Sequence, residues 1–367
     1  MKLFSLSSCL ALAAMLPVVL PADDLADAPF SLRFPAAFGH VSFYGDVAAL
    51  SNASAASKWE SSPNPANKAW GFQEEYDWRL SGQYSNVGFD NGTEFNLTSE
   101  TAAIDAGGAG VFRFALLQIR SNEDWTYGSP LGLGGKKFGF DLDAVQLSWG
   151  KLLSDQFSLG AEVGYSHGET TFTQPSVTLL GVTTPFFVIP SITLPEFELI
   201  HADKDAWSYR LGGLWKPADK WFVGLYGDYV RGTVDTTVTP SPLSTVRFRS
   251  TDVVQQWNVH PGIAYEFEEN AMVHADYEAS WLSDDYGHDL QLNRWSVGTD
   301  IPLMKFLYLR AGAAVDAHSN FSWSSGIGFY PSKHVFIDLA YQNDAFPELK
   351  QEFGRSRTLN ASIAIQW

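Results

Sequence analysis

Cysteine, basic side chains and metal-binding motifs are all scarce in this sequence. Its 367 residues include a single cysteine, Cys9, which we expect to be removed with a signal peptide, so that neither disulfides nor thiol chemistry would operate in the mature protein. Only 24 Lys and Arg stand against 41 Asp and Glu, and the formal net charge of −17 argues against a nucleic-acid partner, because phosphate binding requires a basic face. No glycine-rich nucleotide motif precedes a helix and no Cys/His group has zinc spacing, so neither a cofactor nor a metal site is predicted.

Long apolar runs are confined to the N-terminus. Residues 1–22 combine an early lysine with an apolar stretch and are predicted to be a secretory signal peptide, cleaved after Ala22 or after Ala28. Beyond residue 22 no stretch approaches the roughly 20 apolar residues that a transmembrane helix needs, so no such helix is predicted. An exported, acidic chain with 14% aromatic residues is therefore either a soluble β-protein or an outer-membrane β-barrel.

From about residue 77 onward, apolar and polar residues alternate in segments of about ten residues, which is the pattern of a barrel strand. In the last segment Leu359, Ile363 and Trp367 share an apolar face, whereas Asn360 and Gln366 lie on a more polar face. The segment ends on an aromatic residue, like the terminal strand that bacterial outer-membrane barrels present to their assembly machinery. We therefore expect the barrel assembly machinery to be a partner of this strand.

Aromatic residues and connection lengths favour a barrel over a soluble sandwich. Tryptophans including Trp207, Trp221 and Trp257 are predicted near strand ends on the apolar face, as in the girdles of membrane barrels. Short turns alternate with long connections, which are predicted at Ser121–Lys137, Glu169–Lys204, Gly232–Val254 and Asn343–Arg355. We predict an all-β, transmembrane antiparallel β-barrel of about fourteen strands over residues 72–367, monomeric and in contact with outer-membrane lipid of the Gram-negative type.

Residues 23–71 do not follow the strand pattern. The stretch 46–70 is rich in Ala, Ser and Asn and is too polar to span lipid, so we predict an N-terminal plug, or hatch, in the barrel lumen. Asn64, Pro65 and Ala66 resemble the Asn-Pro-Ala tripeptide in the hatch of the FadL family of outer-membrane long-chain fatty-acid transporters. Strand pairs joined by short polar turns and the expected strand number extend this resemblance over most of the mature chain.

The resemblance implies passive uptake of long-chain fatty acids or similar hydrophobic compounds. It implies that apolar outer loops capture the ligand and that the ligand leaves sideways into the bilayer beside a kinked third strand. The third strand is expected at residues 111–120, and Gly107, Gly108 and Gly110 are the strand-kink candidates, because glycine permits a bulge. A simple turn before the strand is the alternative, and both remain open at this point.

The connection between Glu169 and Glu196 is unusually apolar for an outer loop. It contains no charged side chain between these two acids, and its four prolines prevent a continuous helix. An exposed apolar patch of this size is typical of a binding surface. The predicted ligand-binding residues of this loop are Leu179, Leu180, Phe186, Phe187, Val188 and Ile189. The alternative is a loop that packs on itself or on the plug.

Charged residues are predicted on the lumen face as well. Arg79 and Arg210 are candidates for binding a ligand carboxylate, because arginine can hold one bidentately in a site shielded from water. The alternative, which we favour for any single arginine, is that lumen charges of both signs neutralise one another. His274 and Ser280 lie on one strand, but their spacing shows no catalytic contact, so no catalytic residue and no enzyme are predicted. A general diffusion porin, or a structural or scaffold barrel, is the alternative function.

Overall fold

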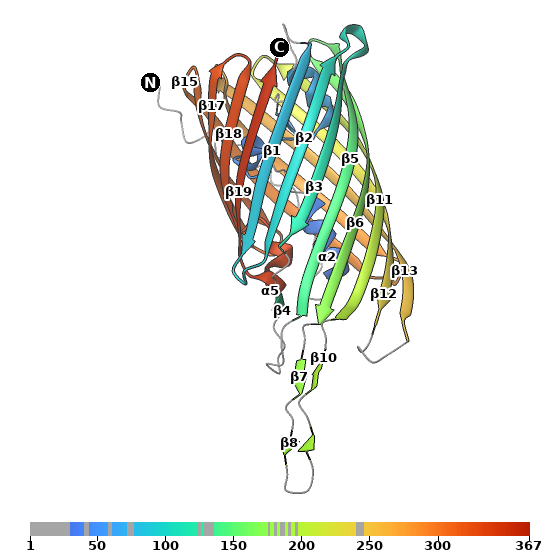
Figure 1. Ribbon diagram of the computed structural model, residues 1–367. Helices are drawn as coiled ribbons and strands as arrows, with labels where there is room; N and C mark the ends of the chain where they lie inside the picture. The colour runs from blue at the N-terminus through green and yellow to red at the C-terminus, as the bar shows by residue number, and fades with distance from the viewer. Residues whose placement is uncertain are drawn as a thin grey trace.

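The chain folds as a closed antiparallel β-barrel in the computed structural model (Figure 1). The structure describes residues 30–39, 44–57, 61–71, 77–122, 126–127, 136–174, 177–179, 182–183, 188–189, 192–194, 197–239 and 246–367. The predicted signal peptide, residues 1–22, lies outside these ranges. Within the described ranges, none of the helices has the length and apolar character needed to cross a membrane.

Fourteen strands of the described chain form the barrel wall, which confirms the predicted fold class. They are β1 (Trp78–Phe89), β2 (Glu94–Asp105), β3 (Val111–Ser121), β5 (Lys136–Ser154), β6 (Phe157–Gln174), β11 (Phe197–Ala218), β12 (Trp221–Val238), β13 (Phe248–Glu268), β14 (Ala271–Asp284), β15 (Asp289–Met304), β16 (Leu307–Asp316), β17 (Phe321–Ser332), β18 (Val335–Asn343) and β19 (Ser356–Gln366). Because β1 pairs with β19 and β3 pairs with β5, none of these fourteen strands has an open edge.

The wall has an apolar exterior and a more polar interior. In β19 and the residue after it, Leu359, Ile363 and Trp367 are 61%, 47% and 52% exposed, whereas Asn360 and Gln366 are 3% and 8% exposed. This is the reverse of a soluble sandwich, in which the apolar face of a strand is the buried one. The outward surface is therefore one that membrane lipid, rather than water, would cover.

Four strands extend further than the sequence pattern predicted. The predicted connection Glu169–Lys204 is strand up to Gln174 and again from Phe197, and the predicted connection Gly232–Val254 is strand up to Val238 and from Phe248. Trp207 and Trp257 accordingly lie well inside β11 and β13, not near their ends. The polar residues at the ends of these four strands were interpreted as loop. They continue as strand because a neighbouring strand satisfies the hydrogen bonds of their backbone groups, which threonine and alternating charged residues permit.

Short ladders extend the connections at one end of the barrel. Between β6 and β11, β7 (Val177–Leu179) pairs with β10 (Ile192–Leu194) and β8 (Val182–Thr183) pairs with β9 (Val188–Ile189). These ladders form a hairpin that extends beyond the wall, at the end opposite to the C-terminus (Figure 1). β4 (Thr126–Tyr127) adds two residues beside β5. We refer to this end of the barrel as the hairpin end.

The N-terminal segments lie against the inward face of the wall, and their blue ribbon is seen within the outline of the barrel (Figure 1). They comprise α2 (Phe30–Gly39), α3 (Gly45–Ala48), η1 (Pro65–Asn67) and α4 (Lys68–Gly71). Three glycines, Gly150, Gly160 and Gly212, face one another in register across β5, β6 and β11. A Cβ on any of them would lie too close to Asn64 or Pro65, so the absence of side chains here permits the close approach of η1.

Candidate functional site

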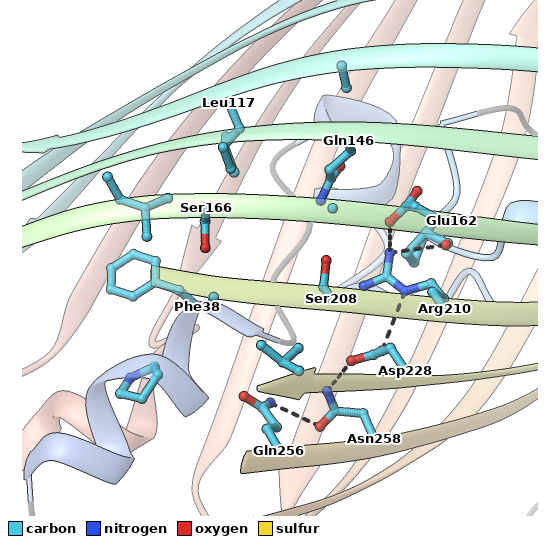
Figure 2. A pocket seen from close by; sticks show the side chains of 18 of the residues that line it. Phe38, Leu117, Gln146, Glu162, Ser166, Ser208, Arg210, Asp228, Gln256 and Asn258 are labelled. Atoms are coloured by element: carbon cyan, nitrogen blue, oxygen red, sulfur yellow. Dashed lines mark hydrogen bonds and ion pairs between the residues drawn. The ribbon is translucent and has the colours of Figure 1, made fainter. Parts of the chain in front are cut away.

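A cavity of about 400 Å³ lies inside the barrel, between α2 and the inward faces of strands from β1 round to β15. Its lining changes in character along its length. Phe38 and Leu117 lie at the hairpin end, whereas Arg210, Asp228 and Glu162 lie deeper in the lumen (Figure 2). The cavity thus has an aromatic chamber at one end and a polar floor farther in.

The aromatic chamber is formed by α2 and the strands opposite to it. Phe34 and Phe38 are one helical turn apart, so they share a face of α2, and their ring centroids are 5.2 Å apart. Phe34 meets Phe140 of β5 edge-on at 4.7 Å, and Phe38 meets Phe95 of β2 at 5.4 Å. Edge-to-face rings at these distances attract one another beyond the burial of their surface. The chamber therefore has a cohesive apolar wall.

The connection between β18 and β19 folds inward and joins this chamber. It contains η3 (Pro347–Leu349) and α5 (Lys350–Phe353). Phe346 lies 5.3 Å from Phe38, and Arg33 of α2 donates hydrogen bonds to the carboxylate of Glu352, at 2.8 Å for one of them, and to the carbonyl of Glu348 at 3.1 Å. Burial of Glu348 raises the pKa of its carboxyl to about 7. Aromatic packing and one ion pair thus hold α2 against this connection.

The polar floor is a connected network of side chains (Figure 2). Arg210 Nη1 donates to Glu162 Oε1 at 3.0 Å, and Arg210 Nε lies 3.4 Å from Asp228 Oδ1. Asn258 Nδ2 donates to Asp228 Oδ2 at 2.5 Å, and Gln256 Nε2 donates to Asn258 Oδ1 at 3.0 Å. Two protein carboxylates therefore neutralise the charge of Arg210. This arrangement matches the alternative given from the sequence, in which lumen charges of opposite sign neutralise one another.

Directional hydrogen bonds hold the N-terminal segments against the barrel wall, next to the polar floor. Asp276 of β14 accepts hydrogen bonds from the backbone N–H groups of Ser54 and Ala55 at 2.7 Å and 2.6 Å. Asn64 accepts the N–H of Ala66 at 3.1 Å, and its Nδ2 donates to the carbonyls of Ala55 and Gly213 at 2.9 Å and 3.1 Å. Asn64 thus caps η1 and links it to β11, which gives a structural reason for the Asn-Pro-Ala sequence.

The predicted ligand-binding residues that the structure describes lie in different parts of the fold. Arg210 lines the cavity, but Arg79 lies near the start of β1 with its guanidinium 5.2 Å from the ring of Phe336. Leu179 belongs to β7, and Val188 and Ile189 form β9, in the hairpin beyond the wall. The remaining predicted loop residues, Leu180, Phe186 and Phe187, lie outside the described residues.

The strand-kink candidates form a turn. Gly107 and Gly108 belong to η2 (Gly107–Ala109), and Gly107 and Gly110 have φ angles of 61° and 97°, which favour glycine. β3 follows this turn and pairs with β2 and β5 in ladders that carry no register shift. The ladders of β3 therefore carry no bulge, and these glycines lie in a turn before the strand, as the alternative describes.

Sequence reasoning missed most of the residues that build the cavity. Phe34 and Phe38 were placed in a generic plug, although their spacing of four residues is a signal for one helical face. Phe140 comes three residues after the predicted connection Ser121–Lys137 and was not among the predicted site residues; it lies in β5, which begins at Lys136. The contacts of Asp276 have no local signal, because its partners Ser54 and Ala55 are more than 200 residues away along the chain.

Two further groups of polar residues contain side-chain types that occur in catalytic and metal sites. His274 and Ser280 are six residues apart on β14, which separates them by about 20 Å, so they do not form a nucleophile and base pair. Glu169, His201 and Asp203 each have one ligand atom within 4.8 Å of the others and could hold a divalent cation. These three residues lie on the outward face of β6 and β11 and do not line the cavity.

No known family profile matches the chain, and no curated protein is detectably similar to it in sequence. Solved structures, in contrast, resemble it over most of its length. The CymD monoaromatic hydrocarbon channel has a TM-score of 0.56 at 14% identity, with 89% of this chain and 98% of that chain covered. The toluene transporter TodX of P. putida has a TM-score of 0.54 at 14% identity, with the same coverage of 89% and 98%.

A FadL homologue of Pseudomonas aeruginosa is similar to the same degree, with a TM-score of 0.55 at 15% identity over 88% of this chain and 97% of that chain. Identities this low establish a shared architecture and leave the ligand of this chain to be inferred from its own residues. Together with the closed wall of fourteen strands, they confirm the resemblance stated from the sequence at the level of fold. The chain has the fold of the FadL-type barrels.

Proposed function

We propose that the chain is an outer-membrane transporter for the passive uptake of long-chain fatty acids or similar hydrophobic compounds. The observation that carries this proposal is the aromatic chamber, lined by Phe34, Phe38 and Phe140 inside a barrel whose exterior is apolar. A cavity lined mainly by apolar and aromatic side chains with a few polar groups suits a hydrophobic ligand. Two of the barrels of this fold are a monoaromatic hydrocarbon channel and a toluene transporter, which supports the same broad ligand class.

We assign residues 23–71 to a hatch that closes the lumen to small polar solutes. The parts of this segment between residues 44 and 71 contact wall strands from β5 round to β19 through main chain and side chains. A general diffusion porin requires a continuous aqueous passage through the barrel. The dense contact of these residues with the wall supports a closed transporter over a porin.

We also propose where the ligand is captured and where it leaves the barrel. The hairpin formed by β7–β10 extends beyond the wall and carries an apolar sequence, which supports its assignment to ligand capture. Lateral release beside β3 would require its ladders with β2 or β5 to open, since both are continuous. We further propose a monomer as the working unit, with β19 and the exposed Trp367 as the element that the assembly machinery binds.

Native mass spectrometry of the detergent-purified protein, combined with single-channel conductance in planar bilayers, tests the proposal. A retained fatty acid or other apolar molecule together with negligible conductance is the expected result, because the chamber would hold the ligand and the hatch would block ions. A steady open channel that retains no apolar molecule would show that the barrel is a porin.

A further inference from the structure

Four carboxylates lie side by side on the outward face of β5, β6, β11 and β12. Asp141 is directly opposite Glu169. Asp203 is directly opposite Glu169 on one side and Asp235 on the other. Paired strands are about 4.8 Å apart, and like charges that face each other at this spacing are destabilising. The row therefore requires positive charge close to it.

The protein supplies partners mainly at the two ends of this row. Arg120 lies 3.7 Å from Asp141 at one end, and Thr251 donates a hydrogen bond to Asp235 at the other, at 2.5 Å. Among the side chains that the structure describes, no Lys or Arg forms an ion pair with Glu169 or Asp203. The two central carboxylates thus lack a permanent cation within the described part of the chain.

His201 lies between these two central carboxylates. Its Nδ1 is 3.1 Å from Glu169 Oε1, and its Nε2 is 3.3 Å from Asp203 Oδ1. One ligand atom from each of the three residues lies within 4.8 Å of the other two. The side chains of Glu169 and Asp203 are 48% and 52% exposed, so an ion can reach them from outside the barrel. Imidazole and carboxylate groups are thus gathered at one accessible point.

This point lies at the base of the hairpin. β6 ends at Gln174, five residues after Glu169, and β11 begins at Phe197, four residues before His201. The chain between these two ends forms the hairpin (Figure 1). Toward the opposite end of the barrel, the rings of Tyr165 and Trp207 are 5.2 Å apart, an aromatic pair typical of a membrane interface. The three residues therefore lie on the water side of that pair.

An imidazole and two carboxylates are ligands that a borderline divalent ion such as Zn²⁺ takes in proteins. The carboxylates balance the charge of the ion, and the ion in turn removes the repulsion between them. Ligand atoms around a tetrahedral Zn²⁺ are about 3.4 Å apart, so rotation of exposed side chains is enough to close the site, with water as the fourth ligand. Ca²⁺ takes about six to eight oxygen ligands and fits these three residues less well.

We propose that Glu169, His201 and Asp203 form a Zn²⁺ site on the outer surface, and that the bound ion ties β6 to β11 at the base of the hairpin. Glu169 comes from β6 and the other two residues come from β11, so the ion links two strands that carry like charges at this point. The inference goes beyond the proposed transport function, because these residues do not line the cavity.

Isothermal titration calorimetry of the detergent-purified full chain, free of affinity tags and treated with a chelator, tests the site. Zn²⁺ and Ca²⁺ are titrated separately into the unmodified chain and into the His201→Ala, Asp203→Asn and His288→Ala variants. His288 is the matched control, because its Nδ1 lies 2.7 Å from a single carboxylate, that of Asp284, in another connection.

We expect the unmodified chain to bind Zn²⁺ at least about ten-fold more tightly than Ca²⁺. His201→Ala removes the nitrogen ligand, so it should weaken Zn²⁺ binding by about ten-fold or more and change Ca²⁺ binding by less than about two-fold. Asp203→Asn should weaken the binding of both ions, and His288→Ala should match the unmodified chain. Unchanged Zn²⁺ affinity in His201→Ala would overturn the assignment.

The unmodified chain provides two measurements that require no variant to fold. A preference for Ca²⁺ over Zn²⁺ would overturn the site, because it would exclude the imidazole as a ligand. Amide hydrogen exchange tests the tie between the strands. At a free Zn²⁺ concentration of about 100 times the Kd, exchange of residues 170–174 and 197–200 should slow by about ten-fold or more. Zn²⁺ binding that leaves this exchange unchanged would contradict the tie between β6 and β11.

Discussion

The two ends of the lumen are held together by different forces. At the hairpin end, α2 and the β18–β19 connection meet the wall through aromatic rings, whose attraction is broad in direction. Farther from the hairpin, Asp276 and Asn64 fix the N-terminal segment through hydrogen bonds of defined geometry, and in-register glycines let its main chain approach the wall. The hairpin end, which is proposed to admit a ligand, is thus held by contacts that can rearrange. The N-terminal segment, which is proposed to block ions, is held in one position.

The largest expected effect is on ion conductance, when the part of the N-terminal segment that these hydrogen bonds hold is deleted. Deletion of residues 46–68 takes away the main chain that contacts the wall from β5 to β18, so a closed lumen should become a steady open channel in planar bilayers. Leu359→Ala, at a side chain that is 61% exposed on the exterior, is the control and should remain closed. Conductance that is unchanged by the deletion would remove the basis for the hatch assignment.

A single substitution can test whether the glycines fix the hatch. In Gly212→Val the new side chain would overlap Asn64 and Pro65, and overpacking of this kind costs typically about 1–3 kcal/mol. We expect brief channel openings, smaller in total than those of the deletion. Gly82→Val on β1 is the matched control, because a Cβ at Gly82 meets nothing within 4 Å. Openings in both variants, or in neither, would show that close contact at Gly212 does not hold the hatch.

Substitution in the aromatic chamber should separate ligand binding from ion blocking. Phe34→Ala removes a ring that contacts four other phenylalanines, and the loss of its contact with the ligand should weaken dodecanoate and dodecanol binding alike, by about ten-fold. The conductance should stay negligible, since the hatch is untouched. Phe321→Ala, at a ring that is 58% exposed on the exterior, serves as the control for both titrations. Opening of the channel by Phe34→Ala would show that the two ends are not independent.

The smallest expected effect is a pH dependence at the hairpin end. Burial raises the pKa of Glu348 from its ordinary 4.5 to about 7, so the packed connection favours the protonated carboxyl. The stability that the packed connection gains from a protonated Glu348 carboxyl is fully present below pH 4.5, and it is lost as the pH rises through 7. Amide hydrogen exchange of Pro347–Phe353, corrected for its intrinsic rate, should therefore be faster at pH 8 than at pH 6. Glu348→Gln should abolish the difference, and a difference that persists in this variant would assign it to another group.

The sequence predicted the barrel more completely than it predicted the site. Period-two alternation is a property of each strand by itself, so the fourteen strands and the outward apolar face could be predicted without any knowledge of their neighbours. The ends of β6, β11, β12 and β13 could not, because the polar residues there continue as strand only where a neighbouring strand pairs with them. For a related reason the sequence could not choose between a kink and a turn at Gly107, Gly108 and Gly110, since a glycine can serve either, and the structure has a turn there.

The sequence by itself determined that the chain has a barrel with an apolar exterior and an N-terminal segment unlike the strands, because composition and periodicity are local properties. Only the tertiary structure decided what the lumen contains. The aromatic chamber draws on α2, four or more strands and the β18–β19 connection, and Asp276 meets Ser54 and Ala55 across 222 and 221 residues of the chain. Whether a lumen cation such as Arg210 has carboxylate partners depends on which side chains the closed wall brings around it, and no pattern along one strand contains that information.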